Sequence, residues 1–241
     1  MTRSKVHSSR WALSCLLPAF VFFLAPTAEA VMISPVLVEL TAKSPVAAVS
    51  LHNDSTKAMR FQVETLVWQQ VEDQDHYEGT QDLLVVPPIA DIAPGASQVF
   101  IISWRARGVG AGERAYRLML EDITQDTSES TGVLNLRFRH NLPVFAMPAG
   151  AARFAPHWRL CAAPVGKGCV RLDNAGNQRI RLYRLSVEGP GWRQEIRGGA
   201  TVLAGAWTQW TFDLAPHYEG PIRVNAKVEG RVLNAELSAP P

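Results

Sequence analysis

The chain has 241 residues, of which 47% are hydrophobic and 19% are charged, and its formal net charge is +2. This near-neutral balance argues against nucleic acid as the main partner, because binding to phosphates needs a basic surface. The length suits two domains of roughly 100 residues each, once a leader segment is set aside.

The first 30 residues have the pattern of a secretory signal peptide. Arg3, Lys5 and Arg10 precede a short apolar stretch at residues 11–25, and Ala28-Glu29-Ala30 is a typical cleavage site. The stretch is short for a transmembrane helix and no other stretch is apolar enough, so we expect no stable membrane insertion. Cleavage after Ala30 leaves 21 basic and 21 acidic residues, which makes the mature protein formally neutral.

The first half of the remaining chain alternates apolar and polar residues over short stretches, as β-strands do. An acidic loop is expected at residues 71–81, and Pro35 interrupts the first strand. The expected strands lie at residues 31–40, 46–53, 59–70, 83–86, 97–104, 113–123 and 132–145. Seven short strands without a convincing helix indicate an immunoglobulin-like sandwich.

A stretch rich in proline, glycine and alanine at residues 147–152 marks a domain boundary. Beyond it we expect strands at 169–172, 180–187, 207–214, 221–228 and 232–237. The predicted fold class is all-β, with a signal peptide at 1–30 and two immunoglobulin-like β-sandwich domains at 31–146 and 147–241, the second one smaller. Cys161 and Cys169, which remain after cleavage, are expected to form a local disulfide in an exported protein.

No stretch carries the residues of a common catalytic or cofactor site. The histidines do not pair at metal-ligand spacing, and two lone cysteines do not complete a zinc site. Adjacent acids such as Glu121 and Asp122 point to opposite faces of a strand, which does not suit acid–base catalysis. We therefore expect a binding protein, not an enzyme, without cofactor or metal. An exported hydrolase is the weakest hypothesis.

The strand expected at residues 132–145 has no evident partner for its apolar face. One face carries Leu134, Leu136, Phe138, His140 and Leu142, and the other carries Arg137 and Arg139. A polar loop at 124–131, without an apolar residue to anchor it, precedes the strand. The apolar row either packs inside its own sandwich, as in any immunoglobulin-like domain, or serves another protein.

Several motifs occur in an informative order. They are Pro87-Pro88, Pro94-Gly95 with Gln98 and Val99, residues 113–118, residues 142–145 and, in the second domain, the turn at 172–177. This order resembles the periplasmic chaperones of chaperone–usher pili, the PapD-like family. The likeness is greatest to the branch that assembles archaic and spore-coat-type fimbriae, and it covers residues 31–148 best.

The resemblance implies a periplasmic chaperone with its two domains in an L shape, pilus subunits as clients and an outer-membrane usher as second partner. In that family the last strand of the first domain is lent to a subunit that lacks a strand, a form of β-augmentation called donor-strand complementation. The client-binding residues would then be Leu134, Leu136, Phe138 and Leu142. Whether the free chain dimerises to cover this edge stays open.

One family feature is missing from the sequence. Classical members bind the client's C-terminal carboxylate with two cations between the domains, but Leu37 and Pro143 stand at those places. Candidates for a moved anchor are Arg105, Arg117 and Arg139.

Glu113 matches the acid of the family's interdomain ion cluster, while Met147 stands where its classical basic partner sits. The alternative function is a structural or adhesive β-sandwich module of a surface fibre. Such a module should begin with a free donor extension, whereas here a strand pattern starts directly after the cleavage site.

Overall fold

The computed structural model describes residues 31–105, 111–125, 137–147, 150–215, 218 and 220–238. These residues form β-strands only, arranged as two sandwiches, so the all-β prediction is confirmed. In this part of the chain no helix is long and apolar enough to cross a membrane. The predicted signal peptide lies outside the described residues and stays a prediction.

The first domain is a sandwich of two sheets around one core, in which Phe61, Phe100 and Tyr116 are fully buried. One sheet has the order β1 (Val31–Ser34), β3 (Val46–Asn53), β8 (Ser97–Trp104), β6 (Leu83–Val86). The other has the order β2 (Val38–Leu40), β10 (Arg139–Ala146), β9 (Arg114–Asp122), β4 (Met59–Val71), β5 (Gln74–Gly79), with β7 (Ile89–Ile92) beside β4.

The first predicted strand is split, and its two halves belong to different sheets. β1 pairs antiparallel with β3, whereas β2 pairs parallel with the end of β10, where Val38 lies opposite Val144. Pro35 lies between them, and proline has no N–H to donate to a ladder, so the interruption follows from the sequence. The first segment of the domain therefore links the two sheets.

The prediction of a loop at residues 71–81 is wrong for Gln74–Gly79, which form β5. β4 and β5 make a long hairpin, and the turn residues Glu72 and Asp73 have φ values of 51° and 63°. Positive φ at both central residues is what a type I′ turn requires. Every residue of β5 is exposed, so the sequence carries no apolar alternation that could reveal the strand. The short β7 was missed as well.

The second domain is a sandwich with its own core. One sheet has the order β11 (Pro156–Leu160), β12 (Lys167–Asn174), β16 (Trp207–Asp213). The other has the order β14 (Trp192–Ile196), β13 (Ile180–Gly189), β17 (Ile222–Val228), β18 (Arg231–Leu237), with β15 (Ala200–Val202) beside β13. The sequence did not predict β11, β14 and β15. A disulfide joins Cys161 to Cys169, with 5.0 Å between the Cα atoms.

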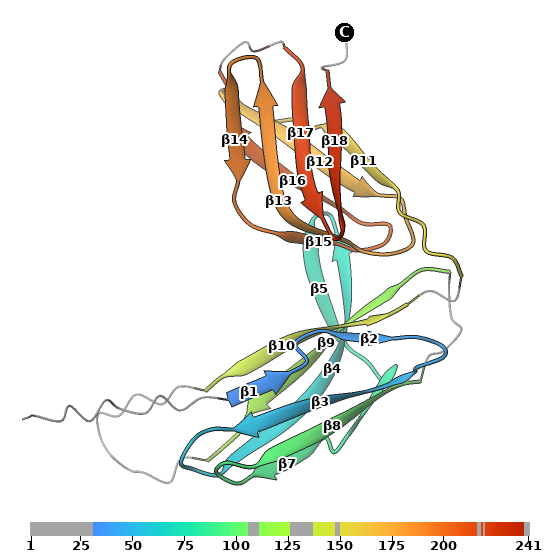
Figure 1. The fold of residues 1–241 in the computed structure, drawn as a ribbon, viewed down its shortest axis with the longest axis vertical. Helices are drawn as coiled ribbons and strands as arrows, with labels where there is room; N and C mark the ends of the chain where they lie inside the picture. Colours follow the sequence, from blue (N-terminus) through green and yellow to red (C-terminus); the bar gives the residue numbers. More distant parts are fainter. Residues whose placement is uncertain are drawn as a thin grey trace, which may run out of the picture.

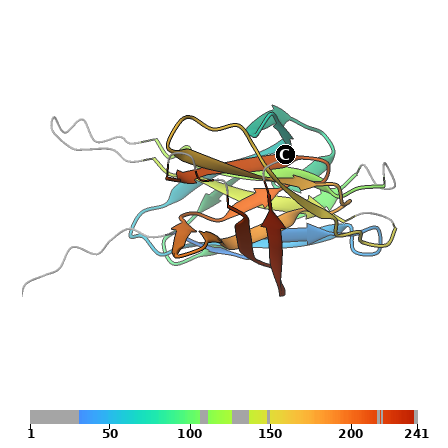
Figure 2. The same cartoon turned by 90° about the horizontal axis from the view of Figure 1, so that it is seen from above.

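No sheet is shared between the strands before and after the connection from β10 to β11. Figure 1 shows the two sandwiches at opposite ends of an elongated molecule, with crossing strand directions and the β4–β5 hairpin reaching from the first towards the second. Figure 2, viewed along the long axis, shows the second domain in front of the first. The exact boundary at residues 146 and 147 stays a prediction.

Candidate functional site

Two strand edges of the first domain that are unpaired within the described residues, those of β1 and β10, face the same groove. β10 pairs with β9 along its whole length, but β2 covers its other edge only at Val144–Ala146. β1 pairs with β3 alone. The residues of β1 and the unpaired part of β10 line one groove of about 440 Å³, which Val31, Ile33, Val36 and residues 139–142 surround. Unpaired N–H and C=O groups on such edges are able to bind another strand.

Large apolar side chains stand exposed around this groove. The exposed fractions are 63% for Met32, 69% for Val36 and 55% for Phe138. Phe138 is one of the four predicted client-binding residues, and Leu134 and Leu136 lie outside the described part of the chain. Exposed apolar side chains next to open strand edges are the features of a surface that binds another β-structure.

Leu142, the fourth predicted client-binding residue, does not belong to this exposed set. Its side chain is only 5% exposed and packs in the core of the first domain with Val144 and Leu118. The predicted apolar row therefore changes its surroundings along β10, from solvent at Phe138 to the chain's own core at Leu142. Leu142 still lines the groove, but most of its side chain is covered by the core of its own domain.

Arg139 and Arg105 are poorly placed as a carboxylate anchor. The Arg139 guanidinium forms ion pairs with Glu64 at 2.8 Å and with Glu121 at 3.8 Å. Arg105 is exposed after the end of β8, which belongs to the other sheet from Pro143. Its backbone N–H donates to the Asp82 carbonyl at 2.7 Å.

Arg117 lies directly opposite Pro143 in the β9–β10 pairing, one strand away from the position of the missing classical cation. Its guanidinium carbon is 3.8 Å from the centre of the Trp68 ring and 5.8 Å from that of Tyr77. The Nε atom is buried and has no hydrogen-bond partner among the described residues. Arg117 also lines a pocket of about 490 Å³ together with Asp75 and residues 199–201 of the second domain.

Buried charges join the two domains at Glu113. This carboxylate accepts hydrogen bonds from the Arg179 backbone N–H at 3.0 Å and from the Arg179 guanidinium, which also pairs with Glu39. The Glu113 side chain is 1% exposed and that of Arg179 is 6% exposed. The guanidinium carbon of Arg179 lies 3.8 Å from the centre of the Phe145 ring. Glu113 was predicted from the sequence, whereas Arg179 was not; this arginine of the second domain supplies the positive charge that Met147 lacks.

Burial raises the pKa of Glu113, and the opposing effect of the Arg179 guanidinium does not cancel it. Removing these charges from water costs free energy, and the hydrogen bonds within the cluster offset that cost. Because the cluster connects β9 to the segment before β13, it fixes how the second domain sits on the first.

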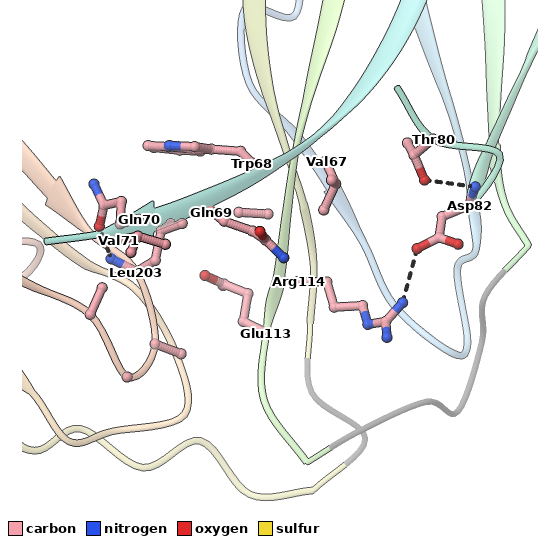
Figure 3. Close-up of a pocket in the computed structure, with 14 residues that line it drawn as sticks. Val67, Trp68, Gln69, Gln70, Val71, Thr80, Asp82, Glu113, Arg114 and Leu203 are labelled. Atoms are coloured by element: carbon pink, nitrogen blue, oxygen red, sulfur yellow. Dashed lines mark hydrogen bonds and ion pairs between the residues drawn. The ribbon is translucent and has the colours of Figure 1, made fainter. Parts of the chain in front are cut away.

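The β4–β5 hairpin makes a second connection between the domains. The Gln70 amide donates to the Thr201 carbonyl at 2.8 Å and accepts from the Leu203 N–H at 2.8 Å. Between the hairpin, Glu113 and the Leu203 loop lies a pocket of about 620 Å³ (Figure 3). At its other end Arg114 pairs with Asp82 at 2.9 Å. Polar contacts therefore link the domains both at Glu113 and at Gln70.

The sequence itself places the chain in a known family. Residues 30–152 match the model of the PapD N-terminal domain, described as a pili and flagellar-assembly chaperone. This match spans half of the chain, and the chain belongs to this family. No curated protein sequence matches it.

Solved structures with the same fold include chaperones of pilus assembly. A chain of the CsuC–CsuE chaperone–tip adhesion subunit pre-assembly complex, from archaic Csu pili of Acinetobacter baumannii, is 17% identical, with a TM-score of 0.65 over 86% of this chain and 98% of that one. The class 5 fimbriae chaperone CfaA is 14% identical, with a TM-score of 0.61 over 88% and 100%. A chain from the complex of SafA pilin with the SafB chaperone of Salmonella enterica is 16% identical, with a TM-score of 0.59 over 88% of this chain and 98% of that one.

These likenesses show the two-sandwich fold, and a chain from an archaic-pilus complex is among them. Pilus chaperones of this family are not enzymes, so the expectation of a binding protein is confirmed. Within the described residues no three His, Cys, Asp or Glu side chains are grouped as a metal site would require.

Proposed function

We propose that this protein is a periplasmic chaperone that captures pilus subunits by adding its β10 edge to their incomplete sandwich and passes them to an outer-membrane usher. The observation that carries the proposal is the pair of unpaired edges, β1 and β10, on either side of one groove. The family assignment and the signal-peptide pattern support it. The similar A. baumannii chain comes from a complex of a chaperone with a tip subunit.

The geometry gives the proposal a physical basis. A client strand beside β10 would gain main-chain hydrogen bonds, and its apolar groove would cover Phe138, together with Leu134 and Leu136 if the strand extends towards the N terminus. Burial of each such side chain is worth about 1.5–3 kcal/mol. No nucleotide is needed, because the client's own folding drives capture.

The test is capture of co-expressed pilus subunits in the periplasm. Phe138→Asp should leave the chain folded but abolish co-purification of the subunit, which would then be degraded; Leu136→Asp should do the same. Tyr183→Asp is the matched control, because Tyr183 is an aromatic residue of the second domain that is 47% exposed. Equal protection of the subunit by Phe138→Asp and wild type would refute the donor role. Purification as a polymer without a partner would favour the structural or adhesive module instead.

Arg117 is our choice for the anchor of the client's C-terminal carboxylate. It lies beside Pro143, lines a pocket between the domains and has an Nε without a partner in the described part of the chain, whereas Arg139 is already ion-paired. The contact with the Trp68 ring restricts the Arg117 guanidinium, whose planar N–H groups suit bidentate recognition of a carboxylate.

The anchor is tested by comparing Arg117→Met with Arg105→Met in the same capture assay. We expect Arg117→Met to weaken capture of a subunit with an intact C terminus by about tenfold or more, and Arg105→Met to have little effect. A subunit that lacks its C-terminal residues should be captured equally well by wild type and by Arg117→Met. Equal capture of the intact subunit by both arginine variants would exclude Arg117 as the anchor.

A further inference from the structure

His140 is a polar side chain on the strand face whose other residues are apolar. In the β9–β10 pairing it lies opposite Leu120, and its neighbour on the same face, Leu142, lies opposite Leu118. Leu118 and Leu120 are fully buried. The imidazole is therefore directed towards the inside of the sandwich, at the level where β10 has an unpaired edge.

The hydrogen-bonding capacity of this imidazole is not met. Its Nε2 atom is buried and has no partner within the described residues. One neighbour is the Phe138 ring, at 6.4 Å between centroids and 25° between planes, which offers no acceptor of the usual kind. A buried polar atom without a partner destabilises the state that contains it.

The groove between the two edges is where a partner could reach the imidazole. His140 lines this groove with Val31, Ile33 and Val36, all apolar. The other polar residues of the lining, Arg139 and Asn141, alternate with His140 along β10 and so point to the outer face of the sheet. His140 is thus the polar group on the inner side of the described groove lining.

We infer that His140 is a specificity-determining residue for the client. A strand inserted between β1 and β10 must bring a hydrogen-bonding side chain, of the hydroxyl or amide class, to the imidazole. Hydroxyl and amide groups both donate and accept, so they suit either tautomer of the imidazole. The inference rests on the proposed function, because it assigns the chemistry of the client at one position of the same groove.

The role follows from an asymmetry in hydrogen bonding. A client with an apolar residue at this position leaves the imidazole unpaired in the complex, whereas one with a hydroxyl or amide satisfies it. One hydrogen bond to a buried group corresponds to roughly a tenfold difference in binding constant. Sites with buried polar groups reject partners that lack the matching group in the same way.

The experiment uses each subunit that co-purifies with the wild-type chain as the probe. We expect His140→Leu to weaken binding of the purified subunit about tenfold, His140→Gln to retain most of it, and His157→Leu, at an exposed histidine of the second domain, to leave it unchanged. The melting temperature of free His140→Leu should be no lower than that of wild type, because an unpaired buried polar atom is removed.

A double-mutant cycle separates specificity from packing. Alanine in place of the client's hydroxyl or amide residue that faces His140 should weaken binding to wild type but not to His140→Leu. Equal subunit affinity for wild type and His140→Leu, while Phe138→Asp binds nothing, would overturn the inference and leave the proposed function standing. Capture by Phe138→Asp as strong as by wild type would overturn both.

Discussion

At the scale of single residues, Arg179 is the positively charged member of the interdomain ion cluster. Its side chain is 6% exposed and pairs with the buried Glu113 and with Glu39. Removal of one partner of a buried ion pair leaves the other charge without compensation, which costs more than the intact pair contributes. Arg179 should therefore be far more important for stability than the arginines on the domain surface.

We predict that Arg179→Met lowers the free energy of unfolding at neutral pH by about 3–5 kcal/mol. The matched control is Arg184→Met, because the Arg184 side chain is 71% exposed and lies 4.0 Å from Glu195. That control should change stability by less than about 1 kcal/mol. Urea denaturation followed by tryptophan fluorescence measures both. Similar losses in the two variants would contradict the role assigned to Arg179.

The pKa of Glu113 makes stability depend on pH with a definite sign. Burial raises this pKa above the ordinary value of 4.5, so the folded state keeps the proton to a higher pH than the unfolded state. Ionisation of Glu113 therefore removes stability as the pH rises through the window just above 4.5. Between about pH 4 and about pH 7, wild type should lose stability relative to Glu113→Gln, as measured by unfolding at each pH. A difference that is constant across this range would contradict the raised pKa.

The sequence predicts part of this cluster and not the rest. Glu113 lies in a motif before a clear strand, and the family resemblance marks it as an interdomain acid. Arg179 is 66 residues away and follows a turn without any local pattern of its own. Its role depends on how the second domain is placed, which no pattern of short range encodes. The sequence names Arg117, Arg105 and Arg139 equally as candidates for the carboxylate anchor. Only the pairing of β9 with β10, which places Arg117 opposite Pro143, distinguishes Arg117 from the other two.

At the scale of elements, β10 has two parts with different surroundings. The part from Val144 onward lies between β9 and β2, and the part before it has β9 alone. Period-two alternation predicts which residues share a face, but both a core face and a free face show the same period. The sequence therefore could not tell that Leu142 already belongs to the core.

This division predicts a large loss of stability at one position and almost none at the other in the free protein. Leu142→Ala should lower the free energy of unfolding by about 2–5 kcal/mol, because a buried leucine is removed from the core. Phe138→Ala should change it by no more than about 0.5 kcal/mol, because Phe138 is 55% exposed. Thermal or urea unfolding of the two purified variants gives the comparison. A large loss in Phe138→Ala would mean that this ring packs inside its own domain.

At the scale of the whole molecule, polar contacts in at least two places hold the domains together. One is the Glu113–Arg179 cluster, and another is the pair of hydrogen bonds from Gln70 on the long β4–β5 hairpin. Trp68 and Phe145 of the first domain also pack in the core cluster of the second. Domains coupled in this way are expected to unfold as one unit.

We predict a single calorimetric transition for the wild-type protein and two for the double variant Arg179→Met with Gln70→Ala. Loss of these two polar connections should weaken the coupling enough for each domain to unfold in its own transition, although the packing of Trp68 and Phe145 and the hydrogen bond from the Glu113 N–H to the Asn177 carbonyl remain. The control is Arg184→Met with Gln62→Ala, which changes the same residue types at exposed positions. Two transitions already in the wild type, or one in the Arg179–Gln70 double variant, would contradict the coupling.

The two-sandwich architecture could be predicted at this scale, because short alternating strands and the proline- and glycine-rich connection are local features of the chain. The docking of the domains could not. It depends on Gln70 at the end of a hairpin whose second strand has no apolar alternation, and on an arginine from the other domain.

The exchange of sheets between β1 and β2 has a further consequence. Because β2 already covers β10 from Val144, a strand added beside β10 must stop at Pro143. The free edge within the described residues is five residues, Arg139 to Pro143, or about 17 Å of strand. The protein's own N-terminal segment therefore acts as a fixed end stop, and it would set the alignment of every incoming strand to the same residue whatever the sequence of that strand.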